Sequence, residues 1–278
     1  MNSQPYILIR TLLSTLLWTA IPHAVLAASS FECLIEPNQT ADIRSSVVGT
    51  ISQITVHRGE VIHKGQPLVA LESDYEQAAF ELARYKAQMN GQVREAAAKF
   101  EFAKRAYERK RDMHEKKLMS AQDMEDAEKD MKADEAELQM AQENHQVAVL
   151  ESAEQEANLN RRTIRSPFDG VVVDQLLFPG EIADLSDPKK PILKIAQIDP
   201  LLIRIIFPRA LFGEIRKGTP VTIAPEAPVG GQFRSYIKIV APIVDAASGT
   251  FIAFAQAPNP QLKIPAGIRC QASLTGSP

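Results

Sequence analysis

The sequences IRSSVVGTISQITVHRGEV at residues 43–61 and IRSPFDGVVVDQLLFPGEI at residues 164–182 are two copies of one pattern. Both begin with Ile-Arg-Ser and continue, at the same spacing, with a Gly and then a Gly-Glu pair. Chance is a poor explanation for this similarity, because it would have to produce six identities at one constant offset. Each copy is typical of a small β unit of about 30 residues, in which Gly turns separate short strands. One such unit is too small to bury a core, so the two copies are predicted to pair face to face. The turn glycines are Gly49, Gly59, Gly170 and Gly180.

The segment between the copies, residues 74–162, has the composition of a helix. It holds 20 acidic and 15 basic residues, no proline, and Gly91 as its single glycine. Ala, Glu, Gln, Lys and Met dominate, and all favour helix. Apolar residues recur at steps of three and four, which indicates a coiled coil. The predicted seam is Tyr75, Ala79, Leu82, Met89, Val93, Ala96, Phe100, Ala103 and Tyr107, then Met124, Ala127, Met131, Leu138, Ala141 and Ala148, with a second stripe of Met140, Val147, Leu150 and Ala157 replacing it further along.

The length of this insert requires it to fold back on itself. A single helix would carry its far end roughly 130 Å away at 1.5 Å per residue, and the two copies could not then pair. We therefore predict an antiparallel hairpin with its tip near residues 114–121, where Ser120 can cap the second helix. The rest of the chain is too small to bury such a rod, so most of the rod should project into solvent.

Residues 198–274 return to a β composition. Five or six short apolar segments, separated by Pro and Gly, surround one short helix predicted for Pro208–Arg216, and this pattern indicates a small β-barrel. The chain is thus an elongated multi-domain α+β protein. The predicted boundaries are 1–27 for a signal peptide, 43–73 with 163–197 for the repeat domain, 74–162 for the hairpin, and 28–42 with 198–278 for the barrel.

Residues 1–27 have the features of a secretory signal. Arg10 precedes the mostly apolar run Thr11–Ile21, and cleavage is expected after Ala27. The alternative is an uncleaved anchor helix, which would hold Arg10 inside it at a considerable energetic cost. In an exported protein Cys33 and Cys270 are predicted to form a disulfide that joins the two ends of the mature chain, and two buried free thiols are the alternative.

Composition and motifs exclude several classes of function. The net charge of −3 gives no general attraction to nucleic acid. The sequence has no phosphate-binding loop and neither GxSxG nor HExxH, so no enzymatic activity and no cofactor are expected. His57, His63, His114 and His145 have no second ligand at metal-binding spacing, so no metal site is predicted. A lipoyl or biotin carrier would need a tight turn with a modified Lys where this chain has the helical insert.

The chain resembles the periplasmic adaptor subunits of tripartite efflux systems, which are membrane fusion proteins of the HlyD type. The resemblance rests on the split IRSxxxG…GE pair around a coiled coil, on GEVIHKGQPLVALES at residues 59–73, and on LLIRIIFP and DAASGTF in the last third. It covers nearly the whole mature chain. It implies a split lipoyl-like flat β-barrel, a coiled-coil hairpin and a small β-barrel domain, located in the periplasm.

The resemblance also implies partners and a docking tip. Adaptors of this family link an inner-membrane transporter to an outer-membrane efflux channel and self-associate, and the resemblance implies a hexamer. Many members of the family have a further, membrane-proximal domain built from both termini, which is expected to be absent or rudimentary here because eight residues follow Cys270. A compact adaptor of this kind favours a transporter of the RND class, with ABC and MFS classes as alternatives. The channel-docking pattern of the family corresponds to Arg109, Met113 and Ser120, with Met where the family has Leu. Spacing alone favours a solvated charge beside Glu108 and Asp112 as the role of Arg109, and the resemblance to the family reverses that preference.

The methionines near the tip leave one alternative open. Met113, Met119, Met124 and Met131 could handle a soft metal in a copper or silver efflux system. Methionine at helical spacing is more often core filling.

Overall fold

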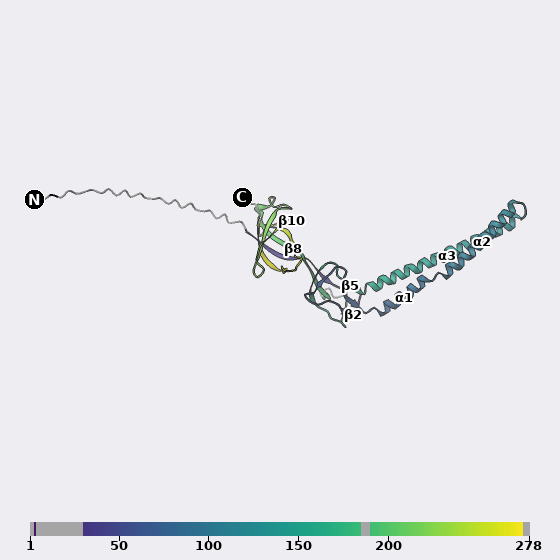
Figure 1. Cartoon of the computed structure of the whole chain (residues 1–278), viewed down its shortest axis with the longest axis horizontal. Coiled ribbons are helices and arrows are strands. Elements are labelled where there is room, and N and C mark those ends of the chain that lie inside the picture. The colour runs from purple at the N-terminus through teal and green to yellow at the C-terminus, as the bar shows by residue number, and fades with distance from the viewer. Residues whose placement is uncertain (1–2, 4–29, 185–189, 275–278) are drawn as a thin grey trace.

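The computed structural model describes residues 3, 30–184 and 190–274, so the signal predicted for residues 1–27 lies outside the described residues apart from Ser3. The molecule is long and narrow, with a β-barrel at one end, a second β domain in the middle and a helical hairpin at the other end (Figure 1). The strands are β1 (Ser30–Ile43), β2 (Gly49–Ile54), β3 (Val61–Ile62), β4 (Pro67–Leu71), β5 (Thr163–Arg165), β6 (Gly170–Gln175), β7 (Ile182–Ala183), β8 (Leu193–Pro208), β9 (Pro220–Pro225), β10 (Phe233–Asp245), β11 (Thr250–Ala257) and β12 (Ile268–Leu274). The helices are α1 (Asp74–Gln88), α2 (Gly91–Glu115) and α3 (Ala121–Asn160), with a short 3-10 helix at Arg209–Leu211.

The last third forms a closed six-stranded barrel. Its strands follow the order β1-β12-β9-β10-β11-β8, and β8 pairs with β1 to close the ring. Side chains alternate between the interior and the solvent, as in β11, because successive residues of a strand point to opposite faces. The interior holds large apolar groups such as Phe207, Phe251 and Ile203. The helix predicted for Pro208–Arg216 is only the one-turn 3-10 segment, and Gly213 at φ 95° follows it.

The middle domain, called here the flat barrel, confirms that the two sequence copies pair. Each copy contributes its short middle strand to the sheet of the other copy, since β3 pairs with β6 and β7 pairs with β2. The backbone contacts repeat with the sequence: the N–H of Gly59 donates to the carbonyl of Val172 at 2.8 Å, and the N–H of Gly180 donates to that of Ile51 at 2.8 Å. A shared core that includes Leu68 lies between the sheets.

The Gly-Glu pairs of the two copies make equivalent turns. Gly59 has φ 81° and Gly180 has φ 91°, a left-handed conformation that favours glycine. The Glu60 carboxylate accepts the backbone N–H of His57 at 2.8 Å, and the Glu181 carboxylate accepts that of Phe178 at 2.6 Å. The repeated Glu therefore closes the turn that the repeated Gly permits.

Two long strands belong to both barrels. β1 and β8 pair from Cys33–Ile205 in the six-stranded barrel to Ile43–Leu193 in the flat barrel, with a bulge between Pro37 and Gln39. At this junction the Asn38 amide donates to the Gln197 side chain at 2.8 Å and accepts from Gln256 at 3.3 Å. A polar network thus separates the two apolar cores, while the backbone continues through both.

The helical insert differs from the predicted pair of unbroken arms. The first arm consists of α1 and α2, which are separated at Met89 and Asn90, whereas the second arm is the single helix α3. Ala96, Ala103 and Ala127 are buried in the seam as predicted. Most of the seam predicted for α1 is wrong. Ala79 is half-buried, but Tyr75, Leu82 and Met89 are exposed and Ala83 is buried in their place, because the break resets the helical phase. The second stripe is also wrong as a seam, because Met140, Val147 and Leu150 are exposed.

Candidate functional site: the hairpin tip and its flanking surfaces

The hairpin tip is a tight, well-bonded turn between α2 and α3. Lys117 has φ 59°, the left-handed conformation that often ends a helix. Its N–H donates to the carbonyl of His114 at 2.8 Å, and the N–H of Leu118 donates to that of Met113 at 2.9 Å. The His114 ring nitrogen Nδ1 lies 3.0 Å from the carbonyl oxygen of Met119. These contacts hold the turn in one shape, and sequence inspection did not anticipate the His114 contact.

Ser120 lies at the N-terminus of α3 and caps that helix. Its hydroxyl oxygen accepts the backbone N–H of Asp123 at 3.2 Å, and the hydroxyl lies 2.5 Å from the carboxylate of the same residue. The Ser120 hydroxyl thus satisfies one of the unpaired N–H groups at the start of α3, and the Asp123 carboxylate places a negative charge at the positive end of the helix dipole. Ser120 remains exposed while it makes these contacts, so its side chain lies at the surface of the tip.

Arg109 and Met113 lie one turn apart on α2, both exposed. Arg111 forms ion pairs with Asp112 at 3.4 Å and Glu115 at 3.9 Å. The Arg109 guanidinium, by contrast, has no hydrogen bond or ion pair to any residue that the structure describes. Its five N–H donors are therefore available to another molecule.

The tip is electropositive, although the insert as a whole is acidic. The segment RKRDMHEKK at residues 109–117 holds five basic and two acidic residues, whereas α3 holds twelve acidic and two basic residues. Leu118, in the middle of the turn, is 70 % exposed. An exposed apolar side chain next to cations at the end of a rod is typical of a residue that contacts another protein. The sequence alone could have indicated Leu118, because it is an apolar residue within a polar turn.

One broad face of the hairpin is apolar, and we call it the hairpin face. Its members are Leu82, Met89, Phe102, Met140 and Val147, each between 52 % and 67 % exposed. Met89 and Met140 border adjoining grooves between the arms that share Gln92, Glu95, Ala141 and Asn144. Phe102 lies seven residues after Glu95, and Val147 seven after Met140, so the helical repeat places them on the same face. Four of these residues, Leu82, Met89, Met140 and Val147, were expected in the seam and are exposed instead.

The base of the hairpin is fixed to the flat barrel by a clamp around Arg162. The guanidinium donates to the carbonyl of Val48 at 3.0 Å and pairs with the Glu76 carboxylate, with both side chains about four-fifths buried. Next to it, Arg161 donates to the carbonyl of Ser46 at 3.1 Å. This clamp was missed from the sequence, because Arg162 and Glu76 are far apart in the chain and neither belongs to the repeat.

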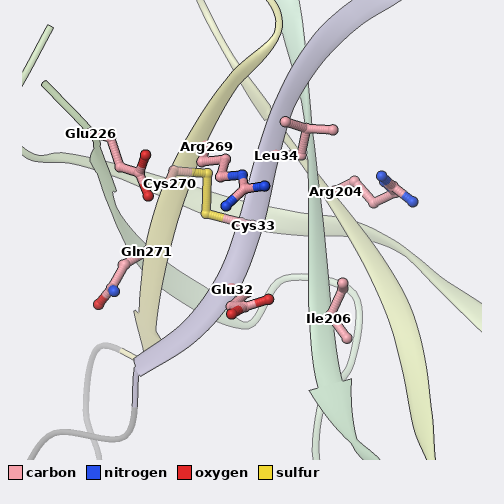
Figure 2. Close-up of a pocket in the computed structure, with 9 residues that line it drawn as sticks. All are labelled: Glu32, Cys33, Leu34, Arg204, Ile206, Glu226, Arg269, Cys270 and Gln271. Atoms are coloured by element: carbon pink, nitrogen blue, oxygen red, sulfur yellow. A yellow bond between two sulfur atoms is a disulfide. The ribbon is translucent and has the colours of Figure 1, made fainter. Parts of the chain in front are cut away.

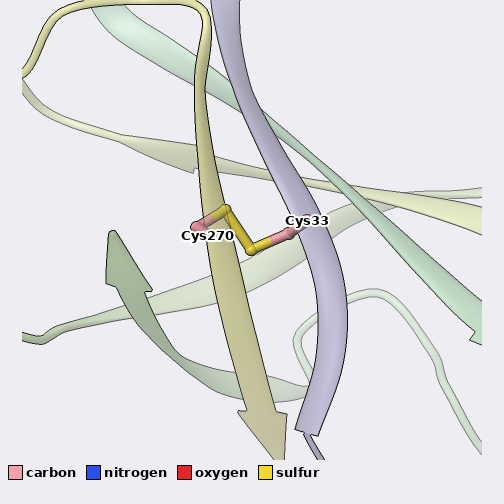
Figure 3. The surroundings of a disulfide bond; sticks show 2 residues. All are labelled: Cys33 and Cys270. Carbon is pink, nitrogen blue, oxygen red and sulfur yellow. A yellow bond between two sulfur atoms is a disulfide. The ribbon is translucent and has the colours of Figure 1, made fainter. Parts of the chain in front are cut away.

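The predicted disulfide between Cys33 and Cys270 is confirmed (Figure 3). The two residues face each other on the neighbouring strands β1 and β12, so the bond joins the first and last strands of the six-stranded barrel. Beside it lies a shallow depression formed by β12, β1 and β8 (Figure 2). Arg204 and Arg269 line it together with Glu32 and Glu226. The charges of opposite sign balance, so this depression has no strong preference for an ion.

Asp169 on the flat barrel and Lys99 on the hairpin have shifted pKa values. The pKa of Asp169 is lowered, first by the backbone N–H of Lys64 at 3.0 Å and then by His63. The Lys99 ammonium lies 2.9 Å from Glu137 on the opposite arm, and this contact raises its pKa.

Within residues 30–184 and 190–274 no three metal-ligating side chains of His, Cys, Asp or Glu lie close together. None of the described helices is apolar and long enough to cross a bilayer.

The four predicted turn glycines lie at two kinds of position. Gly59 and Gly180 occupy the left-handed turns, whereas Gly49 and Gly170 begin β2 and β6. A Cβ atom at Gly170 would meet the carbonyl oxygen of Ala196 at 2.3 Å. All four therefore shape the flat barrel, and they lie in a different part of the molecule from the tip residues Arg109, Met113 and Ser120.

Comparison with known proteins agrees with this architecture. Two relatives are the pyoverdine export membrane fusion proteins PvdR of Pseudomonas aeruginosa, 23 % identical over 75 % of this chain and 54 % of its own length, and PvdR of Pseudomonas putida, 26 % identical over 83 % and 62 %. The chain thus spans about half to three-fifths of the length of these curated relatives. The crystal structure of MacA from Actinobacillus actinomycetemcomitans has the same fold, with a TM-score of 0.71 at 21 % identity over 88 % of this chain and 77 % of that one.

A membrane fusion protein from Streptococcus pneumoniae also shares the fold, with a TM-score of 0.63 at 12 % identity over 90 % of this chain and 100 % of that one. Residues 39–196 match the family described as the CzcB-like barrel-sandwich hybrid domain. Those residues include the flat barrel and the whole hairpin, which is more than half of the chain. The chain therefore belongs to this CzcB-like barrel-sandwich hybrid family, and it is similar to proteins that are named membrane fusion proteins.

Proposed function

We propose that this chain connects an inner-membrane transporter to an outer-membrane exit channel and docks on the channel through its hairpin tip. The observation that carries the proposal is the exposed, electropositive tip at one end of an elongated molecule (Figure 1). Arg109 at this tip has no ionic partner among the described residues, although the neighbouring Arg111 is paired. A rigid turn with free donors is suited to recognition of another protein.

The proposed docking mode is the packing of one helical hairpin against another. Met113 supplies an apolar contact of about the volume of the Leu that the family has at this position. The Arg109 guanidinium donates to carbonyl oxygens that are open at the end of a partner helix, since the last carbonyls of any helix lack partners within it. The hydroxyl of Ser120 caps α3 and lies at the same end of the hairpin.

We also propose that copies of the chain associate side by side, in a closed ring such as a hexamer. The first arm and the second arm differ in charge, because α2 holds seven basic and five acidic residues, whereas α3 has twelve acidic and two basic ones. Placing α2 of one copy beside α3 of the next brings opposite charges together. The exposed side chains of the hairpin face supply apolar area for the same contact. A head-to-tail contact of this kind closes into a ring when its rotation permits.

The proposed inner-membrane partner is a transporter of the RND class, with ABC and MFS transporters as the alternatives. The two Pseudomonas relatives are named for pyoverdine export, which supports a secreted small molecule as the cargo of the assembly. The metal-efflux alternative gains little support from the methionines. Met124 and Met131 are half-buried along α3 and are suited to core filling, while Met113 is exposed at the tip.

Site-specific photo-cross-linking in intact cells tests the proposal. A photo-reactive residue at Leu118, in the tip, should capture an outer-membrane protein. The same residue at Phe178, an exposed apolar position on the flat barrel, is the matched control and should not. One at Tyr236 on the six-stranded barrel should capture the inner-membrane partner and identify its class. Capture of the outer-membrane protein at Phe178 and not at Leu118 would contradict docking through the tip.

A further inference from the structure

The end of the six-stranded barrel that points away from the hairpin carries exposed apolar side chains. Two segments form this end: the β8–β9 connection at residues 209–219 and the β10–β11 hairpin at residues 236–249. We call them the barrel rim. β8 leaves the flat barrel at Leu193 and reaches this end at Pro208, where it pairs with Thr250 of β11. The barrel rim and the hairpin tip are therefore at opposite ends of the molecule (Figure 1).

Backbone contacts make the two segments of the barrel rim one surface. The N–H of Arg209 donates to the carbonyl of Gly249 at 2.9 Å, and the N–H of Gly218 donates to that of Ile237 at 2.8 Å. The ring of Phe212 packs edge-on against Phe251 at 5.3 Å, and Phe251 is paired with Val244 of the neighbouring strand. The rim is thus a continuous part of the folded barrel.

A bulge in β10 directs apolar side chains outward at this surface. Between the pairs Val240–Ala253 and Val244–Phe251, β10 advances four residues while β11 advances two. The extra residues include Pro242, which has no N–H to donate, and Ile243, which is 76 % exposed. Ile239 and Phe212 are also about half exposed. Bulges of this kind commonly re-aim side chains at functional edges, and a purely structural hairpin tip would carry polar residues here.

Positive charges surround these apolar groups. Arg209, Arg216, Lys217 and Lys238 lie on the barrel rim, and none of them forms a salt bridge with any residue that the structure describes. The acidic residues of the rim are Glu214 and Asp245. The Asp245 carboxylate already accepts the backbone N–H groups of Ala247 at 2.8 Å and Ser248 at 3.2 Å. Exposed aliphatic and aromatic groups beside unpaired cations are the combination that binds the interface of an anionic bilayer.

The path of the chain also points to a bilayer. β1 begins at Ser30, which pairs with Ser273 near the end of β12, and both residues lie at the rim end of the barrel. The sequence that precedes Ser30 contains the uncharged run Thr11–Ile21. A segment of that composition enters a bilayer as a signal or as an anchor. The rim end is therefore the end of the barrel at which β1 begins.

We propose that the barrel rim docks on the surface of an anionic lipid bilayer. Ile243, Ile239 and Phe212 enter the headgroup region, and the four cations lie level with the lipid phosphates. The contact is a lipid contact of the adaptor itself, made at the end opposite the hairpin tip and independent of what the tip binds.

An environment-sensitive fluorophore tests this on the purified full chain. The probe is attached at Ile243→Cys, with Ile182→Cys as the matched control: Ile182 is 64 % exposed but lies on the flat barrel. The two native cysteines are joined in the disulfide and do not compete for the label. Vesicles of phosphatidylcholine with phosphatidylglycerol should shift the emission of the residue-243 probe to shorter wavelengths. The residue-182 probe should emit as it does in buffer, and added salt should reduce the shift at residue 243.

Variants in the residue-243-labelled chain measure the two components. Ile239→Asp should lower the partition coefficient into these vesicles about tenfold, the change that loss of one buried aliphatic side chain produces. Lys238→Glu should lower it only for vesicles that contain the anionic lipid, and Val173→Asp, on the flat barrel, should leave it unchanged. The proposal is overturned if the residue-243 probe does not respond to vesicles, if both probes respond equally, or if residue 243 responds only when an inner-membrane protein is reconstituted with the lipid.

Discussion

Replacing Gly170 with alanine should destabilise the flat barrel much more than the same change at its repeat partner, Gly49. The added Cβ at Gly170 would lie 2.3 Å from the carbonyl oxygen of Ala196, well inside van der Waals contact. Ala196 is paired with β1 through Thr40 and with β6 through Val171, so this carbonyl is held from both sides. At Gly49 the added Cβ would meet the Arg162 guanidinium at 2.6 Å, which is the end of a flexible side chain.

The magnitudes follow from what must move. Gly170→Ala forces a shift of the β8 backbone and should lower the free energy of unfolding by about 2–3 kcal/mol, in the range of overpacked cores. Gly49→Ala displaces Arg162 from the carbonyl of Val48 and should cost about 1 kcal/mol, the net value of one hydrogen bond. Gly91→Ala is the control: nothing lies within 4 Å of its added Cβ. Alanine favours helix there and should stabilise by up to about 1 kcal/mol.

Hydrogen exchange of peptides that cover β6 and β2 measures the free energy of opening of the flat barrel directly, without interference from the hairpin. The far-ultraviolet circular dichroism of each variant checks that the helices remain formed. The reasoning fails if Gly170→Ala opens with a free energy within about 0.5 kcal/mol of the parent chain, the usual limit for a surface change. It fails equally if Gly49→Ala is as costly as Gly170→Ala, since the two positions differ only in their neighbours.

Four further outcomes are expected. Arg109→Glu should reduce cross-linking of the tip to the outer-membrane partner at least about tenfold, because it removes charge-assisted donors, whereas Arg94→Glu on the same helix should have little effect. The double change Cys33→Ala with Cys270→Ala should lower the free energy of unfolding by up to about 4–5 kcal/mol in the chain-entropy account, and a reductant should then have no further effect on urea unfolding. Arg162→Ala leaves the largely buried Glu76 carboxylate without its partner and should cost about 1–3 kcal/mol, seen as faster hydrogen exchange in the first turn of α1, with Arg161→Ala milder. Because the pKa of Asp169 is lowered in the folded chain from the ordinary 3.8, its contribution to stability is present above that pH and lost as the pH falls through the folded pKa; Asp169→Asn should remove this acid-dependent loss in a pH series of urea unfolding.

The repeat made the flat barrel predictable, because a conserved offset between two copies survives any error in the assignment of single strands. The disulfide between Cys33 and Cys270 was also predictable from the sequence, since two cysteines in an exported protein have few alternatives to pairing. The seam in α1 was not predictable from spacing alone. A heptad pattern fixes a face only while the helix is continuous, and the break at Met89 and Asn90 changed which face meets α3.

Features of the site that depend on distant contacts were also missed. The clamp between Arg162 and Glu76 joins residues at the two ends of the insert, and charged pairs of that kind leave no local pattern. The bulge in β10 was missed as well, because nothing in the spacing of the apolar residues marks the extra residues between Val240 and Val244. The pattern Arg109, Met113 and Ser120 was available from the sequence, but the absence of a partner for Arg109 among the described residues required coordinates.

The continuity of β1 and β8 through both barrels has a mechanical consequence. A pull along the long axis, applied between the tip and the barrel rim, is carried by two covalent strands and by the row of hydrogen bonds between them. The force acts parallel to the strands, so many of these hydrogen bonds must break at the same time. Because β1 and β8 continue through both barrels, the two barrels are not held together by a separate interface that could open first. The joint between the two barrels should therefore resist extension along the long axis more strongly than two domains that only touch would.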